Sequence, residues 1–215
     1  MADFRSNLKF KDYDASRILI DSIASKLTQR ENEVRNMIIN DIVNNGKAFV
    51  IDNVADDIKE IILALKAKNA LAIAEDNNIY SIYPVSAQCS NHKVTLKDGR
   101  ELKAMCAVDA LGATYTFNQD TKIDSKCTEC GKEIKVVVVG GNIVSLEPTD
   151  AHVLHADLNR FDNWSCSCCN TMHFFCSKEH CLEWVNKNNV CKDSNFCIDA
   201  NEALSVGRMI FSDNE

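Results

Sequence analysis

Eleven cysteines in a 215-residue chain constrain the fold more than any other feature of this sequence. Disulfides persist mainly in oxidising compartments, and the first residues, MADFRSNLKFKDYD, are too charged and polar for a secretory signal. The cysteine count is odd and the spacing is clustered, which favours thiolate or metal chemistry over a disulfide framework. A chain of this length can bury a core without cross-links. We therefore expect a cytoplasmic protein that folds around its hydrophobic core and keeps its thiols free.

Charge and hydropathy exclude two further classes of protein. The net charge of −7 argues against a protein that works by neutralising nucleic-acid phosphates. No apolar run approaches the roughly 20 residues that a helix needs to span a bilayer. We expect a soluble chain with neither a membrane nor a nucleic acid as its partner.

Residues 1–85 are predicted to form a helical domain that ends in a hairpin. Apolar residues recur with helical spacing in three segments, 14–27, 31–46 and 53–70. Asp14 is a candidate cap for the first segment, and Gly46 ends the second. Two short strands then follow around a turn at residues 76–78. Three helices and a hairpin form a winged helix-turn-helix outline. Because its third helix lacks a basic stripe, we expect this domain to pack rather than to bind DNA.

Residues 86–215 have a different pattern, in which strands predominate. Strand-like runs with glycine turns cover residues 92–105, 122–148 and 150–158. Helical patterns occupy residues 103–112, 177–189 and 199–211, the last with Asp199 as its cap. The expected fold is α+β: an N-terminal winged-helix-like helical domain (residues 1–85) followed by a mixed α/β catalytic domain with antiparallel strands (residues 86–215).

Cys106 and Asp109 lie three residues apart in the apolar, alanine-rich segment 103–112. On a helix they share one face. Two thiols from distant parts of a chain, meeting beside a carboxylate, suit a soft metal such as mercury. The thiolates weaken a metal–carbon bond, and the carboxyl group can take a proton from a thiol and deliver it to carbon. The second thiol would come from the cysteine cluster of residues 164–181.

The cysteines after residue 112 also fit a structural zinc site. One candidate set joins two C-x-x-C pairs: Cys127 and Cys130 with Cys166 and Cys169. A second set lies within the C-terminal cluster: Cys166, Cys176 and Cys181, with or without Cys169. Either set would favour a zinc-binding winged-helix metal sensor without catalysis. The isolated Cys89, Cys191 and Cys197 are expected to pack as small buried hydrophobes.

Several motifs resemble, in chain order, those of the organomercurial (alkylmercury) lyases: MCAVDAL, SKC, VSLEP, CCNTMHFF and LEW. The resemblance covers most of residues 93–211, and the helical N-terminus is similar to the winged-helix-like domain of that family. It implies an enzyme without a required cofactor that cleaves carbon–mercury bonds by protonolysis to a hydrocarbon and Hg(II). Such an enzyme serves mercury detoxification and resistance.

The resemblance also implies roles for individual residues. The catalytic cysteine of the family and the aspartate three positions later match Cys106 and Asp109. A second catalytic cysteine, four positions before the histidine of HFF, matches Cys169. These three residues would also hold the Hg(II) product, which would then pass to cytosolic thiols or to a mercuric reductase. Cys127 matches a cysteine regarded as structural in the family.

This sequence also departs from the family pattern. Cys168 adjoins Cys169, so a shift of one residue in register would exchange their roles. Met105 stands where the family often has tryptophan, and the additional C-terminal cysteines leave open a related lyase that acts on another organometal. We expect His173 to pack in the core rather than to act as a general base.

Overall fold

The structure is a computed structural model that describes residues 4, 8–160, 164 and 168–212, and it has the predicted α+β character with antiparallel sheets. The α-helices are α1 (Gln29–Asn45), α2 (Asp56–Ala67), α3 (Ala107–Phe117), α5 (Lys178–Lys187) and α6 (Ala200–Phe211). Short 3-10 turns occupy η2 (Ala15–Arg17), η3 (Ala24–Lys26), η4 (Ile51–Asn53) and η5 (Leu158–Arg160). No helix among the described residues is long and apolar enough to cross a membrane.

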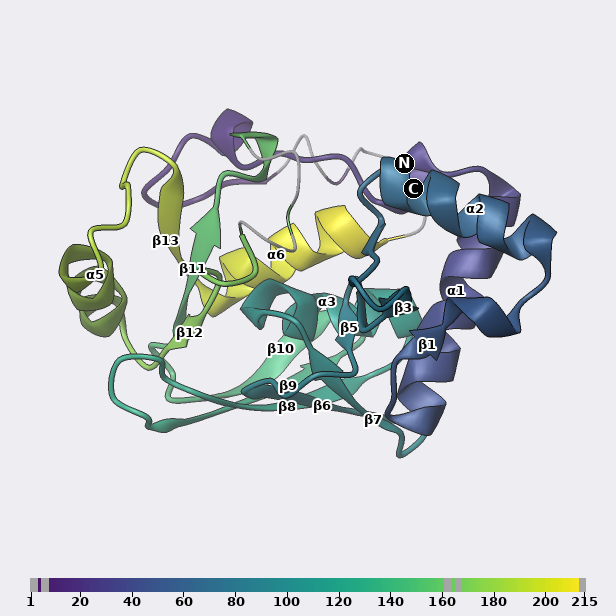
Figure 1. The fold of residues 1–215 in the computed structure, drawn as a ribbon. Coiled ribbons are helices and arrows are strands. Elements are labelled where there is room, and N and C mark those ends of the chain that lie inside the picture. The colour runs from purple at the N-terminus through teal and green to yellow at the C-terminus, as the bar shows by residue number, and fades with distance from the viewer. Residues whose placement is uncertain (1–3, 5–7, 161–163, 165–167, 213–215) are drawn as a thin grey trace.

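One large antiparallel sheet forms the lower layer of the molecule in the view of Figure 1. Its strand order is β10-β9-β8-β6-β7-β5-β4-β2. Its strands are β2 (Leu71–Ala72), β4 (Ser81–Ile82), β5 (Val85–Ser86), β6 (His92–Leu96), β7 (Glu101–Ala104), β8 (Thr121–Lys126), β9 (Glu133–Val139) and β10 (Asn142–Glu147). Along β8, buried and exposed side chains alternate strictly, so one face packs on the core and the other meets solvent.

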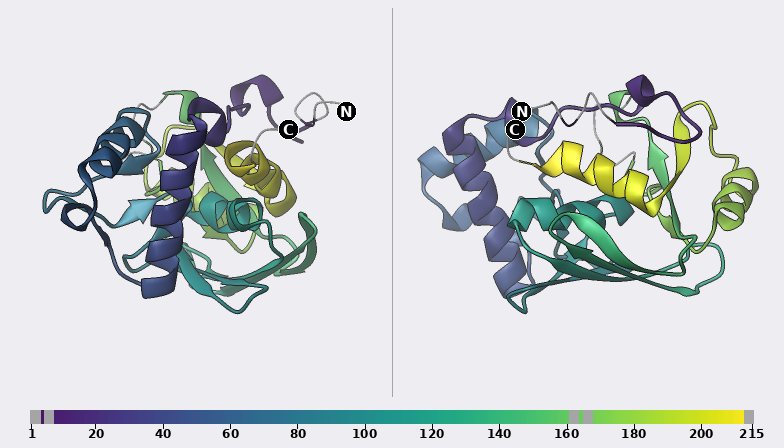
Figure 2. Two further views of the ribbon diagram at one scale, coloured as in Figure 1. Left: turned by 90° about the vertical axis from the view of Figure 1, so that its right-hand side faces the viewer. Right: turned by 180° about the vertical axis from the view of Figure 1, so that it is seen from behind.

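Two smaller sheets complete the strand pairing. The order β12-β11-β13 joins β11 (His152–Ala156) to β12 (Phe174–Phe175) and β13 (Asn195–Asp199), and β1 (Phe49–Val50) pairs with β3 (Asn78–Ile79). The three-stranded sheet rises from one end of the large sheet, with α5 on its outer side (Figure 1). Helices α1 and α2 lie at the opposite end, as both further views confirm (Figure 2).

Helix α3 is the centre of the layered packing, because it lies between the large sheet and α6 (Figures 1 and 2). Every residue from Ala107 to Thr114 is buried. The two helices cross at a pair of glycines: a β-carbon added to Gly207 would lie 3.0 Å from the Cα of Gly112. A side chain at this crossing would hold the helices apart. The glycines therefore allow α6 to cover α3 closely.

The predictions for residues 86–215 are largely confirmed. The hairpin of residues 92–105 forms as β6 and β7 around Gly99, which has φ +91°. The later strand patterns form β8 to β11, and the C-terminal helical patterns form α5 and α6. Asp199 caps α6 in a reciprocal capping box with Glu202.

The N-terminal prediction is partly wrong. Segment 14–27 is not a helix; it forms η2 and η3, although Asp14 does cap η2. Tertiary packing overrides its helical pattern, because Ile23 is buried and donates a backbone hydrogen bond to the Ile210 carbonyl in α6 at 3.0 Å. The described part of residues 1–85 thus contains two α-helices instead of three.

The predicted N-terminal hairpin is present. Strand β2 precedes the turn at residues 76–78 and pairs antiparallel with β4, which follows it, while the intervening β3 pairs with β1. Strands from both sides of residue 85 lie in one continuous sheet. Helix α1 ends at Gly46 as predicted, with φ +64°, and it begins at a capping box on Thr28.

The glycine crossing predicts an unusual response to alanine. In an unconstrained helix, Gly→Ala stabilises by about 1 kcal/mol. We expect Gly207→Ala instead to destabilise by about 1–3 kcal/mol, because the new methyl group would press on the backbone of α3. Urea unfolding measures this change, with Asn201→Ala at an exposed position of α6 as the control. A stability equal to or above that of wild type would show that the crossing tolerates a side chain.

Candidate active site

The first thiol of the site lies where β7 gives way to α3. Cys106 is the N-cap of α3, in extended conformation, and its Sγ accepts a hydrogen bond from the backbone N–H of Asp109 at 3.4 Å. A side-chain acceptor at this position satisfies one of the free N–H groups that begin every helix. The positive end of the helix dipole also favours negative charge on the sulfur. The strand-to-helix turn therefore fixes the thiol and orients it.

Asp109 lies one turn into α3 and is only 3 % exposed. Burial raises the pKa of its carboxyl group to about 7, although the Cys106 side chain, the Cys106 backbone and the charge of Arg35 act in the opposite direction. Its Oδ2 atom is buried and has no hydrogen-bond partner among the described residues. The carboxyl group is therefore poised near neutral pH, with one oxygen available to a ligand.

The second thiol comes from the loop that precedes β12. The Sγ of Cys169, the Sγ of Cys106 and a carboxylate oxygen of Asp109 all lie within 4.8 Å of one another. The loop is held against α3 by a 3.0 Å hydrogen bond from the backbone N–H of Ala107 to the Met172 carbonyl. Residues far apart in the sequence thus form one group that a single ion could contact.

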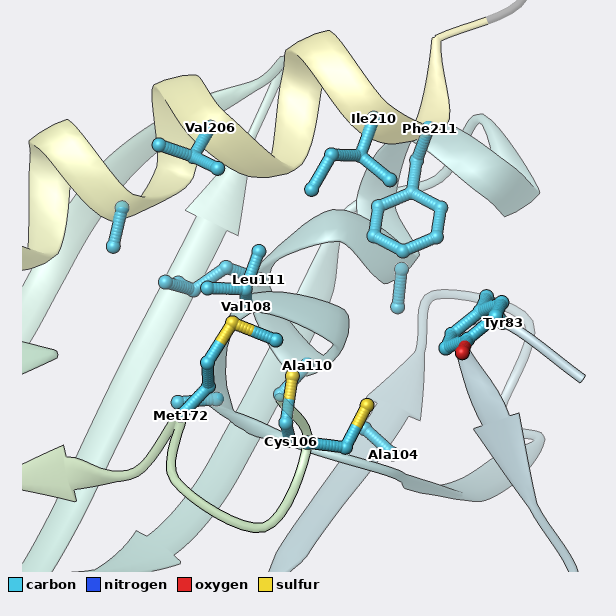
Figure 3. Close-up of a cluster of buried hydrophobic side chains, with 14 of the residues drawn as sticks. Tyr83, Ala104, Cys106, Val108, Ala110, Leu111, Met172, Val206, Ile210 and Phe211 are labelled. Carbon is cyan, nitrogen blue, oxygen red and sulfur yellow. The ribbon is translucent and has the colours of Figure 1, made fainter. Parts of the chain in front are cut away.

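The surroundings of this group are apolar. Figure 3 shows Cys106 among buried side chains of α3, with Met172 beside it and Val206, Ile210 and Phe211 of α6 above. Cys106 is fully buried, whereas Cys169 is 7 % exposed. Burial, followed by the neighbouring Cys169 and Asp109, raises the pKa of the Cys106 thiol well above its usual range. In the absence of a metal, Cys106 is therefore a protonated thiol at neutral pH.

The neighbouring Cys168 does not belong to this group. It is fully buried, and burial together with Cys169 and Asp157 raises its pKa to about 12. The geometry thus brings Cys106 and Asp109 together with Cys169, the cysteine that the family resemblance implies. His173 packs its ring edge-on against Trp184, with centroids 5.4 Å apart, and burial lowers its pKa.

Sequence reasoning missed one charged residue near the site. Arg35 of α1 is 5 % exposed, donates from Nη2 to the Tyr83 carbonyl at 2.6 Å, and lies close enough to lower the pKa of Asp109. Its position in the sequence does indicate burial, because Arg35 falls on the same apolar helix face as Ile38 and Ile42. The N-terminal region thus contributes a cation to the surroundings of Asp109.

The expected zinc sets are not the sets that the structure assembles. Cys169 lies with Cys106, and Cys181 lies in hydrogen-bonding contact with Cys197, so neither joins Cys176. Cys166 lies outside the described residues. A second group forms instead: Cys127, Cys130, Cys176 and His180. The prediction that isolated cysteines are buried holds for Cys197 but is wrong for Cys89 and Cys191, which are exposed.

Comparison with known proteins agrees with this architecture. The family model described as "MerB: Alkylmercury lyase" matches residues 85–212. The alkylmercury lyase of Bacillus cereus is 24 % identical over 169 residues, which cover 77 % of this chain and 75 % of that protein. The alkylmercury lyase of Staphylococcus epidermidis is 28 % identical over 111 residues, 52 % of this chain and 50 % of that protein.

A solved structure shares the fold. The "Crystal structure of the mercury-bound form of MerB2" aligns with a TM-score of 0.69 at 21 % identity, covering 87 % of this chain and 92 % of that one. The family match spans more than half of the sequence and includes the whole segment from Cys106 to Cys169. The chain is an enzyme that belongs to the alkylmercury lyase family.

Proposed function

We propose that this enzyme cleaves the carbon–mercury bond of organomercurials by protonolysis, with Cys106, Asp109 and Cys169 as its catalytic residues. The observation that carries the proposal is the convergence of two thiols and a carboxylate in one buried group. Thiols are the ligands that a soft metal prefers, and a carboxyl group of pKa about 7 can both accept and donate a proton at neutral pH.

Capture of the substrate comes first. Cys169 is the most exposed of the three residues, so it meets the R–Hg⁺ ion before the others. The Cys106 thiol must lose its proton to become the second ligand, and its raised pKa means that this proton needs an acceptor. The ionised Asp109 carboxylate lies beside it and takes that proton. Mercury displaces the thiol proton of Cys169, which passes to solvent, and both sulfurs then bind the metal as thiolates.

Cleavage follows without any change in oxidation state. The two thiolates donate electron density to mercury and weaken its bond to carbon. The electron pair of the Hg–C bond leaves with carbon, and the proton held by Asp109 forms the new C–H bond. The products are the hydrocarbon R–H and Hg(II) on both sulfurs, with Asp109 again a carboxylate that contacts the metal. The apolar surroundings exclude water from this transfer.

Release of Hg(II) requires competing thiols. We propose that cytosolic thiols or a mercuric reductase accept the ion, which fits a cytoplasmic role in mercury detoxification and resistance. Soft metals exchange between thiolate ligands, and Cys169, the least buried of the three residues at 7 % exposure, offers a route of exit.

The division of the chain at residue 85 also stays a proposal. The match to the family model begins at residue 85, which supports residues 86–215 as the catalytic domain. We propose that residues 1–85 form a winged-helix-like domain that supports the catalytic domain by packing and does not bind DNA. The burial of Arg35 near Asp109 supports such a packing role.

Substitution of the cysteines tests this function. We expect wild-type protein to release benzene from phenylmercury in excess thiol. Cys106→Ala and Cys169→Ala should each lose at least a hundredfold in rate, because a single thiolate activates the bond too weakly. Cys168→Ala is the matched control, since its sulfur lies outside the group, and it should keep most of the activity. No benzene from the folded wild type would refute the function, and an inactive Cys168→Ala beside an active Cys169→Ala would refute the assignment.

The pKa of Asp109 predicts a pH-dependent effect on stability. The group titrates at about 7 in the folded chain against an ordinary value of 3.8, so its contribution to stability is present at low pH and lost as pH rises through 7. Asp109→Asn cannot ionise, so its stability should not follow this titration. We expect its free energy of unfolding, relative to that of wild type, to increase by about 3 kcal/mol from pH 5 to pH 8. Urea unfolding of both proteins at each pH measures this gain. A difference that does not change with pH would show that Asp109 has an ordinary pKa.

A further inference from the structure

A second group of metal-ligand side chains lies apart from the catalytic residues. Its four ligand atoms, the sulfurs of Cys127, Cys130 and Cys176 and a ring nitrogen of His180, all lie within 4.8 Å of one another. Three separate segments supply them: the turn between β8 and β9, the residue after β12, and the first turn of α5. No step of the proposed reaction uses these residues.

The distances within the group fit a tetrahedral metal ion. Zn–S bonds of 2.3 Å in a tetrahedron place two sulfurs about 3.8 Å apart, and a sulfur and a nitrogen about 3.6 Å apart. The Sγ atoms of Cys130 and Cys176 are 3.7 Å apart, and Cys127 Sγ lies 3.7 Å from Nδ1 of His180. The distance from Cys176 Sγ to the same nitrogen is shorter, at 3.2 Å.

The turn between β8 and β9 is shaped to present its two thiols. Gly131 has φ +73°, and its N–H donates to the Cys127 carbonyl at 2.8 Å, which closes the turn. The closed turn carries Cys127 and Cys130, whose sulfurs lie within 4.8 Å of each other and of the Cys176 sulfur.

Neither a disulfide nor hydrophobic packing accounts for this group of side chains. A disulfide needs sulfurs about 2.05 Å apart, so the 3.7 Å between Cys130 and Cys176 describes two separate thiols. Packing as small hydrophobes does not explain the group either, because Cys130 is exposed and His180 is a polar, partly exposed side chain. A bound metal ion is consistent with both the distances and the exposure.

We propose that Cys127, Cys130, Cys176 and His180 bind a structural Zn²⁺ ion. Three thiolates and one imidazole form a closed tetrahedral set, with no position left for a substrate. Soft sulfur ligands in this geometry select zinc over hard cations such as magnesium or calcium. The proposal does not depend on the lyase reaction, since neither site shares a residue with the other.

The ion would join three segments that already touch. The N–H of Thr128 donates to the Phe174 carbonyl at 3.0 Å, and Lys187 of α5 forms a 3.0 Å ion pair with Glu129. Cys176 directly follows β12, and the loop that carries Cys169 directly precedes it. Zinc would thus fix the far end of the strand that positions the catalytic loop, and its loss would destabilise the fold.

Metal analysis of the purified chain tests the proposal. Tag-free protein, expressed with added zinc and never exposed to mercury, should carry about one equivalent of zinc by mass spectrometry. Replacement with Co(II) should give the absorption bands of a tetrahedral thiolate complex. Cys130→Ser should lose most of the zinc, whereas Cys191→Ser, which changes another exposed cysteine outside the group, should retain it. Removal of zinc by a chelator should lower the melting temperature of wild type by several degrees.

Three results would overturn the proposal. The first is wild-type protein that contains no zinc and whose melting temperature does not change with a chelator. The second is a cobalt spectrum typical of octahedral coordination. The third is a disulfide between Cys130 and Cys176 in freshly reduced protein. If Cys130→Ser fails to fold, the cobalt spectrum of wild type decides, because three sulfur ligands give intense charge-transfer absorption and a site without thiolates does not.

Discussion

The close packing of α3 between the large sheet and α6 is the constraint on which the site depends. Gly112 and Gly207 let the two helices approach so closely that an added β-carbon would contact backbone. This approach buries the first two turns of α3, including Cys106 and Asp109. A wider separation would admit water and return both groups to their ordinary pKa values. The catalytic chemistry that we propose is therefore a consequence of helix packing.

Burial of Asp109 destabilises the folded state, and the same burial gives the carboxyl group the raised pKa that the proposed reaction needs. An ionised carboxylate in an apolar interior is costly unless it is paired, and one oxygen of Asp109 has no partner among the described residues. The same burial raises the pKa of the carboxyl group to about 7, where it can carry a proton between a thiol and carbon. The positive charge of Arg35 on α1 limits this rise in the pKa of Asp109.

The sequence pattern predicted individual strands, helices and turns well, but it did not predict which distant segments pack together. The hairpin of β6 and β7 and helix α6 follow from spacing and capping residues. The helix predicted over residues 103–112 begins only at Ala107, so Cys106 is the N-cap of α3 and not a residue within it. The prediction of a helix over residues 14–27 failed because the segment is fixed by long-range packing: Ile23 is buried and donates a backbone hydrogen bond to α6. The second metal-ligand group could not be predicted, since the partner of Cys127 depends on how β12 and α5 pack. Resemblance to a family, not spacing, singled out Cys169.

Mass spectrometry of Asp109→Asn tests the central claim most directly, because it separates capture from cleavage. The variant retains both thiols, so it should bind phenylmercury at Cys106 and Cys169. It lacks the group that carries the proton to carbon, so it should keep the intact phenylmercury adduct and release little benzene. Wild type should retain bare Hg(II) under the same conditions. Bare Hg(II) on the variant, with benzene released at the wild-type rate, would contradict the role of Asp109 as the proton carrier.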